Sequence, residues 1–97
     1  MSAVQESVDI GTLIGRSPGI KRGSPHLSGT SVLVRTIVRW HQSGLLPEEI
    51  VAKYGFLTLH QVHAALAYYY ANRTEIDTEL ERIDKEADEL ESQFSSP

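Results

Sequence analysis

The stretch that most constrains the fold covers residues 44–70 and reads GLLPEEIVAKYGFLTLHQVHAALAYYY. Pro47 followed by two glutamates indicates a helix start, because proline suits the first helical position and acids suit the first turn. Gly55 is a stop signal for that helix. Thr58, with Gln61 three residues later, predicts a capping box at the start of a second, longer helix. Two helices joined by so short a glycine-containing turn predict a helix-turn-helix.

The composition suits one small domain with extensions. The chain has 97 residues, and 40% of them are hydrophobic, which is enough for a modest core. It contains no cysteine, so disulfides and thiolate metal sites are excluded. Its apolar runs are far shorter than the roughly 20 residues of a membrane-spanning helix, and the N-terminus lacks the pattern of a signal peptide. We therefore expect a cytoplasmic protein with no membrane contact.

Charge is divided unevenly along the chain. Residues 1–73 hold seven basic side chains against four acids, a net charge of +3, whereas residues 74–97 hold two against nine, a net charge of −7. A mildly basic body followed by an acidic segment predicts two surfaces that meet different partners. A solvated acidic helix with no partner would have the same composition.

The N-terminal third predicts little regular structure. Residues 1–11 are polar and aperiodic and predict a disordered lead, and residues 13–14 could form a short strand. Residues 26–27 and 32–33 predict two short β segments around a turn at residues 29–30. A pair of strands with no other support is only marginally stable in water. They need to pack on the helices or to pair with a second subunit, which is one reason to expect a homodimer.

Residues 33–43 predict a further helix, closed by Gly44. Its apolar stripe consists of Leu33, Val34, Ile37, Val38 and His41. Arg35 and Arg39 lie one turn apart on the opposite side. This pair suits phosphate contacts in a protein–DNA complex, and two solvated arginines would give the same pattern. A weaker basic cluster of Arg16, Lys21 and Arg22 lies in the preceding loop.

The helix that begins at Leu59 would be the recognition helix of a helix-turn-helix. Its predicted inward stripe is Leu59, Val62, His63, Leu66, Tyr69 and Tyr70. Recognition helices read bases with residues near their N-terminus. The candidate DNA-reading residues are therefore Thr58, His60, Gln61 and Ala64. However, residues 54–72 contain neither arginine nor lysine, which is unusual for a helix inserted in a groove of DNA, where phosphate attraction supplies much of the affinity.

The C-terminal segment predicts an amphipathic helix. Residues 75–94 contain no glycine or proline, and their apolar positions are Ile76, Leu80, Ile83, Ala87, Leu90 and Phe94. So narrow a seam suits a coiled coil or the groove of a partner. Arg73 interrupts the seam and Asn72 offers a cap, which predicts a bend near residue 73. The domains expected are thus a helix-turn-helix domain over residues 12–72 and an acidic helical tail over residues 73–97.

Several separate motifs are similar to those of the domain-of-unknown-function 433 family. The opening motif is carried by Gly23, Pro25, Gly29, Thr30, Val32 and Val34. The resemblance continues in order through the helix-turn-helix and covers roughly residues 12–80. Ser24 and Ser31 stand where the family commonly has basic residues, so no DNA-binding role is transferred to these two positions.

The resemblance implies a VapB-like antitoxin of a type II toxin–antitoxin system. Such proteins are commonly paired with a PIN-like ribonuclease toxin. A dimeric, homeodomain-like helix-turn-helix body would bind operator DNA, and the C-terminal helix would cover the toxin. The fold expected is mainly α, with a three-helix body, a short N-terminal β segment and the long C-terminal helix. The expected partner-binding residues are Ile76, Leu80, Ile83, Leu90 and Phe94.

No arrangement of residues predicts catalysis. Ser31 and His41 lack an orienting acid, and His60 and His63 lack a third metal ligand and differ in direction by about 60° on a helix. We expect no enzyme, metal or cofactor. Two alternatives remain open: a homo-oligomeric structural or adaptor module that does not bind DNA, and a stand-alone transcriptional regulator.

Overall fold

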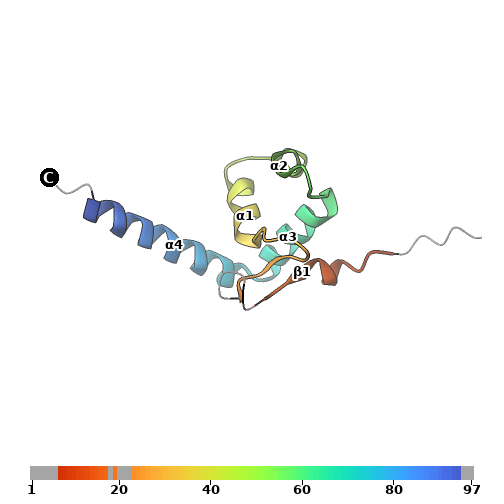
Figure 1. Ribbon diagram of the computed structural model, residues 1–97, viewed down its shortest axis with the longest axis horizontal. Helices are drawn as coiled ribbons and strands as arrows, with labels where there is room; N and C mark the ends of the chain where they lie inside the picture. Colours follow the sequence, from red (N-terminus) through yellow and green to blue (C-terminus); the bar gives the residue numbers. More distant parts are fainter. Residues whose placement is uncertain (1–6, 18, 20–22, 95–97) are drawn as a thin grey trace, which may run out of the picture.

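A computed structural model describes residues 7–17, 19 and 23–94 of the chain. It shows a body of three helices from which a fourth, long helix projects (Figure 1). The predicted mainly α fold, with a helix-turn-helix body and a short N-terminal β segment, is confirmed. The elements are η1 (Ile10–Leu13), β1 (Ile14–Gly15), β2 (His26–Leu27), α1 (Val34–Gln42), α2 (Pro47–Tyr54), α3 (Leu59–Ala71) and α4 (Arg73–Phe94).

The helix-turn-helix is formed by α2 and α3, and its caps are those that the sequence predicts. Pro47 is the first residue of α2, and the Glu49 carboxylate accepts a hydrogen bond from the backbone N–H of Leu46 at 2.8 Å. Gly55 ends α2 in the left-handed conformation, with φ of 72°, which an L side chain adopts only at a cost. Thr58 caps α3 through the predicted capping box.

The hydrophobic core lies where α1, α2 and α3 meet. The largest completely buried side chains of these helices are Val34, Ile37, Val38, Ile50 and Val62. The buried face of α3 differs from the predicted stripe, because Ala64 and Ala65 are buried whereas Leu59, His63 and Tyr70 are exposed. The reason is that α3 contacts η1, β1 and β2 as well as α1 and α2, so residues on more than one side of the helix are buried.

The short strands pair within the chain. β1 and β2 are antiparallel, with Ile14 opposite Leu27 and Gly15 opposite His26. An isolated bridge joins His26 to Leu33, as the predicted turn at residues 29–30 requires. Both strands also contact α3. Because β2 pairs with β1 and packs on α3 within one chain, the strands give no reason to expect a dimer.

The chain bends sharply between α3 and α4, at the predicted position. Asn72 is non-helical, with φ of −135° and ψ of 44°. Its backbone N–H donates to the carbonyls of Tyr68 and Tyr69 at 2.9 and 3.0 Å, and its side-chain amide donates to that of Tyr68 at 3.0 Å. The bend turns α4 back beneath α1, where Ile76 and Leu80 enter the core.

The ends of the chain are only partly described. Residues 1–6 of the predicted lead lie outside the described residues, and η1 begins within the remainder of it at Ile10. Lys21 and Arg22 of the predicted basic cluster and the side chain of Phe94 also lie outside. Over the described ranges, no helix combines the length and the apolar character required to cross a bilayer.

Candidate functional site

Two of the four predicted DNA-reading residues are used to start α3. The Thr58 hydroxyl accepts a hydrogen bond from the backbone N–H of Gln61 at 3.3 Å, and the Gln61 side-chain oxygen accepts one from the backbone N–H of Thr58 at 2.8 Å. His60 is exposed, with its Nε2 3.2 Å from the Thr58 hydroxyl. A base contact by Thr58 or Gln61 would compete with the cap. His60 is thus the predicted reader with an exposed ring.

The fourth predicted reader, Ala64, is only 4% exposed. It lines a groove of about 550 Å³ between α3 and the η1–β1 segment and also a second hollow of about 530 Å³, and the two share Ile10, Ala64 and Ala67. Ile10, Leu59 and Tyr70 are large apolar residues that remain exposed on these elements. The outward face of α3 therefore combines exposed apolar side chains with His60 and His63, and it carries no arginine or lysine. Such a face suits contact with protein better than contact with phosphate.

The two arginines of α1 both form ion pairs with α4, although Arg39 is exposed, as predicted, and Arg35 is not. Both point toward α4, where Arg35 lies 3.3 Å from a Glu79 carboxylate oxygen and Arg39 lies 2.5 Å from one of Asp84. The Arg35 side chain is only 17% exposed. The sequence placed these arginines on the polar side of α1 correctly, but it did not show that α4 folds back to cover that side.

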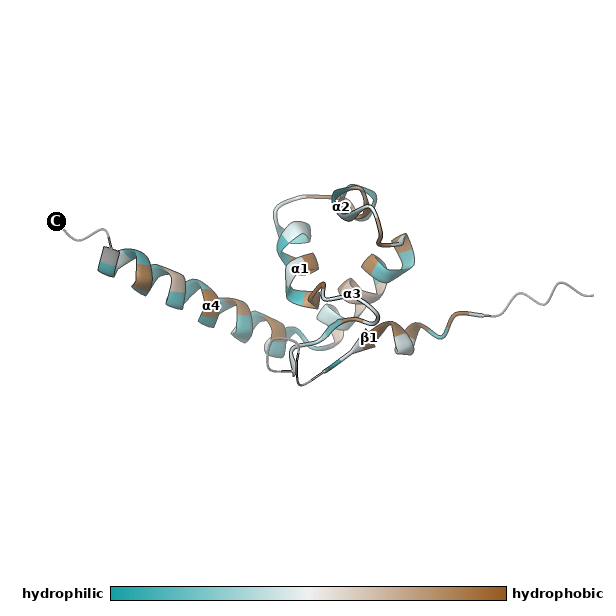
Figure 2. Cartoon of the chain, in the orientation of Figure 1, coloured by the Kyte–Doolittle hydropathy of each residue, from teal (hydrophilic) through white to brown (hydrophobic). Residues whose placement is uncertain are grey.

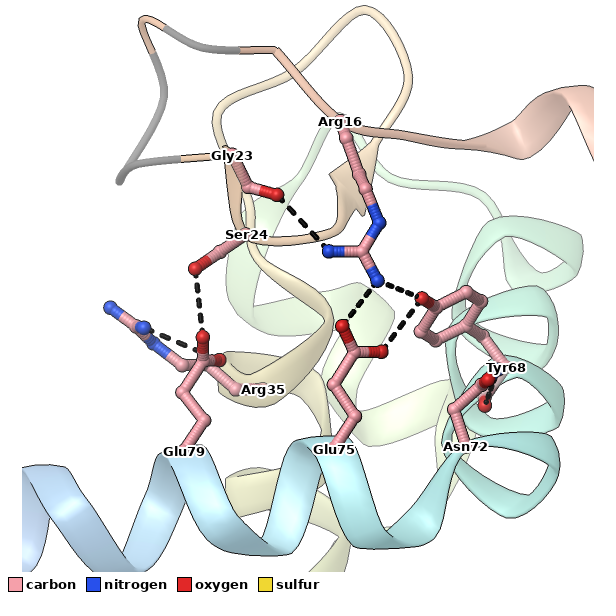
Figure 3. A network of polar contacts seen from close by, with 8 residues as sticks. All are labelled: Arg16, Gly23, Ser24, Arg35, Tyr68, Asn72, Glu75 and Glu79. Atoms are coloured by element: carbon pink, nitrogen blue, oxygen red, sulfur yellow. Dashed lines mark hydrogen bonds and ion pairs between the residues drawn. The ribbon is translucent and has the colours of Figure 1, made fainter.

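A third arginine joins the N-terminal segment to the bend between α3 and α4 (Figure 3). Arg16 forms an ion pair with Glu75, donates to the Tyr68 hydroxyl at 2.5 Å and donates to the Gly23 carbonyl at 3.2 Å. Tyr68 donates in turn to Glu75 at 2.9 Å. In the same region Ser24 donates to Glu79 at 2.8 Å. The acids at the start of α4 therefore contact the N-terminal loop, α1 and α3 together.

These contacts shift the pKa values of the groups involved. Partial burial acts to raise the pKa of Glu75, but hydrogen bonds from Arg16 and Tyr68 and the charge of Arg16 outweigh it, so the net pKa lies below its ordinary value. Burial, followed by the hydrogen bond to Glu75, raises the pKa of Tyr68. The hydrogen bond to Glu75 raises the pKa of Arg16. All three groups hold their usual charge at neutral pH.

The lowered pKa of Glu75 gives a pH-dependent contribution to stability. A carboxylate whose folded pKa is depressed stabilises the fold above its unfolded pKa, here close to the ordinary 4.5, and loses that contribution as the pH falls through the folded pKa. Chemical denaturation of the wild type and Glu75→Gln should therefore show a difference of at most about 1 kcal/mol at pH 7, because the pair is exposed. The difference should vanish below the lowered pKa. A difference that persists or grows in acid would contradict this assignment.

The apolar seam of α4 divides into two parts. Ile76 and Leu80 are 0% and 6% exposed within the core of the body. Ile83 is partly buried, whereas Leu90 is 55% exposed, and brown apolar segments recur toward the far end of α4 (Figure 2). The structure thus uses Ile76 and Leu80 internally, contrary to their prediction as partner-binding residues. Beyond Leu80 the seam leaves the core, first at the partly buried Ile83 and then at the exposed Leu90.

The remaining candidates for a chemical site among the described residues are metal ligands and the buried His26. They contain no group of three or more histidine, cysteine or acidic side chains that could hold a metal ion. The buried His26 has its Nδ1 3.1 Å from the Leu27 carbonyl and its Nε2 3.1 Å from the Ser17 hydroxyl, so its ring supports the β1–β2 segment. That the chain is not an enzyme stays a prediction.

Comparison with known proteins gives a family but no activity. The sequence profile of a family described as "Protein of unknown function (DUF433)" matches residues 14–69. A crystal structure of a DUF433 member protein from Anabaena variabilis is similar, with 34% sequence identity, a TM-score of 0.66 and coverage of 70% of this chain and 67% of that chain. A search of curated proteins finds no match. The shared region includes the β segments and the helix-turn-helix.

Proposed function

This chain belongs to the DUF433 family, and we propose that it is the antitoxin of a type II toxin–antitoxin pair. The proposed partner is a PIN-like ribonuclease toxin, bound by the part of α4 that extends from Ile83 to the end of the helix. The exposed residue Leu90 and the predicted residue Phe94 belong to this surface. In its second role the helix-turn-helix binds operator DNA as part of a homodimer.

The exposed distal half of α4 is the observation that carries the toxin-binding role. The first turns of α4 bury Ile76 and Leu80 in the body, but the helix continues to Phe94. At about 1.5 Å per residue, the stretch from Ile83 onward projects far beyond the last core contact. A projecting amphipathic helix gains stability when its apolar strip is covered by a groove in a partner.

Inhibition by this helix would be steric. Active sites of PIN-like ribonucleases are clusters of acids that bind metal ions, so the acids of α4 would be repelled from them. The apolar seam around Ile83 and Leu90 would instead dock in an apolar groove beside the active site. The helix would then obstruct access of RNA. The acids of α4 would remain in solvent around the contact.

The DNA-binding role is favoured by one observation, the capped α2–turn–α3 unit. In helix-turn-helix proteins the second helix lies in the major groove, and a dimer binds two half-sites. Here the outward face of α3 offers His60 but no arginine or lysine. Most of the affinity would therefore come from phosphate contacts made by other elements.

The toxin-binding role is tested by co-expression with the PIN-like protein that we expect in the neighbouring reading frame. Growth should stop when that protein is expressed alone and recover when the full-length chain is expressed with it, and the two should co-purify. If growth is not rescued although both proteins are soluble, the antitoxin assignment is wrong. Recovery without co-purification would also argue against direct neutralisation.

The DNA-binding role is tested separately, by titrating the protein with a fragment of its own promoter and with a random-sequence duplex of the same length. Operator binding predicts tighter binding to the promoter fragment and an affinity that falls steeply between 50 and 200 mM salt, by orders of magnitude for about six or more phosphate contacts. Equal binding to both duplexes, or none, would remove this role and leave the adaptor alternative.

A further inference from the structure

Almost every described cation of the body is paired with an acid of α4. The body, over described residues 7–17, 19 and 23–72, has four basic side chains. Lys53 lies over the ring of Trp40, 4.3 Å from its centroid. The other three, here called the arginine face, are Arg16, Arg35 and Arg39. Their α4 partners, here called the masking acids, are Glu75, Glu79 and Asp84 respectively.

The masking acids are not what holds α4 against the body. Ile76 and Leu80 do this, because they are buried in the core. Two of the three ion pairs are open to water: the Arg16 and Glu75 side chains are 48% and 39% exposed, and those of Arg39 and Asp84 are 43% and 59% exposed. Exposed ion pairs contribute little to stability. Another anion can therefore displace these carboxylates from the arginines with little loss of folding stability.

The third ion pair, between Arg35 and Glu79, is more buried than the other two, and its hydrogen bonding is incomplete. One Glu79 oxygen accepts the hydrogen bond from Ser24, and the other lies 3.3 Å from Arg35. That second oxygen is buried, and within the described part of the chain it has no hydrogen bond. A guanidinium pairs with phosphate through two parallel hydrogen bonds. Arg35 is thus held by a carboxylate that does not use its full hydrogen-bonding capacity.

We infer that the arginine face is a binding face for the phosphate backbone of duplex DNA, and that α4 masks it in the free protein. The masking acids occupy the guanidinium groups in place of phosphates and cancel their charge. The inference rests on the proposed function for the class of ligand, since the helix-turn-helix belongs to the same body. It explains how a chain with an uncharged α3 could bind DNA, and why it would bind weakly while the masking acids are paired with the arginines.

The test compares two full-length variants with the same change in net charge. The unmasked variant carries Glu75→Gln, Glu79→Gln and Asp84→Asn. The control carries Glu81→Gln, Asp88→Asn and Glu89→Gln, which alter exposed acids of the same helix. The probe is a fluorescent random-sequence duplex, titrated at several salt concentrations, and thermal melting checks that both variants fold.

The unmasked variant should bind the random duplex at least about tenfold more tightly than the wild type, and its salt slope should steepen by about 0.9 for each arginine that gains a phosphate. The control should gain about threefold or less, from net charge alone. Adding Arg16→Gln and Arg39→Gln to the unmasked variant should remove most of the gain, because only Arg35 of the arginine face then remains. Equal gains in both variants, or no gain in a folded unmasked variant, would overturn the inference.

A smaller pair of variants covers the case in which the triple variant does not fold. Asp84→Asn removes an exposed masking acid beyond the last buried residue of α4, and Asp88→Asn is its control. Asp84→Asn should tighten binding by about threefold, and Asp88→Asn should tighten it clearly less, through net charge alone. Because the probe is a random duplex, this result does not depend on operator specificity. Tighter binding to anionic phospholipid vesicles without tighter binding to duplex would contradict the choice of DNA as the ligand.

Discussion

Replacing Ile76 with alanine is expected to lower the free energy of unfolding by about 2–5 kcal/mol. Ile76 is 0% exposed and belongs to the core cluster with residues of α1 and α3. The substitution removes buried apolar surface and leaves a cavity that the surrounding helices can fill only in part. A domain of this size is stabilised by a margin of about 5–15 kcal/mol, so the loss should be visible as a large drop in the denaturation midpoint.

The matched control for Ile76→Ala is Leu90→Ala, on the same helix and the same seam. Leu90 is 55% exposed, so its truncation should change the free energy of unfolding by about 0.5 kcal/mol or less in the free protein. Urea denaturation followed by circular dichroism measures both. Similar losses for the two variants would contradict the division of α4 into a core part and an exposed part.

For partner binding, we expect substitutions in the exposed part of α4 to have the larger effect. The double substitution Ile83→Ser and Leu90→Ser should weaken binding to the PIN-like partner by about 100-fold or more, because apolar anchors at the centre of an interface commonly contribute 2 kcal/mol or more each. Growth rescue should be lost as well. The thermal midpoint of the free protein should stay close to that of the wild type, because neither side chain belongs to the core cluster.

A control for this double variant is Glu81→Ser with Asp88→Ser, which alters two exposed acids of α4 and leaves the apolar strip intact. Its affinity for the partner should change by less than about fivefold, as expected for solvent-exposed charges at the rim of an interface. If the acid variant lost binding while the Ile83 and Leu90 variant retained it, the contact would be electrostatic and the proposed steric mechanism would be wrong.

Local signals in the sequence predicted the helix-turn-helix well. Proline at the start of α2, Gly55 at its end and the Thr58–Gln61 capping box act over a few residues, and the structure contains each of them. The bend at Asn72 was predicted for the same reason. A cap satisfies backbone groups of its own turn, so its effect does not depend on the rest of the fold.

The path of α4 depended on long-range packing that periodicity cannot show. The seam predicted the apolar side of the helix but not what would cover it, and the body covers Ile76 and Leu80 while Leu90 stays exposed. The same fold-back placed the polar side of α1, with Arg35, against the acids of α4. Likewise, the burial of Ala64 required η1 to lie beside α3, in a segment whose composition suggested no structure.

The most direct test of the account is amide hydrogen exchange along α4, in the free protein and in its complex with the PIN-like partner. We predict that amides near Ile76 and Leu80 exchange as slowly as those of α1 and α3 in both states. Amides beyond residue 84 should exchange rapidly in the free protein and become protected in the complex. Strong protection of that distal half in the free protein, or no added protection on binding, would contradict this division of α4.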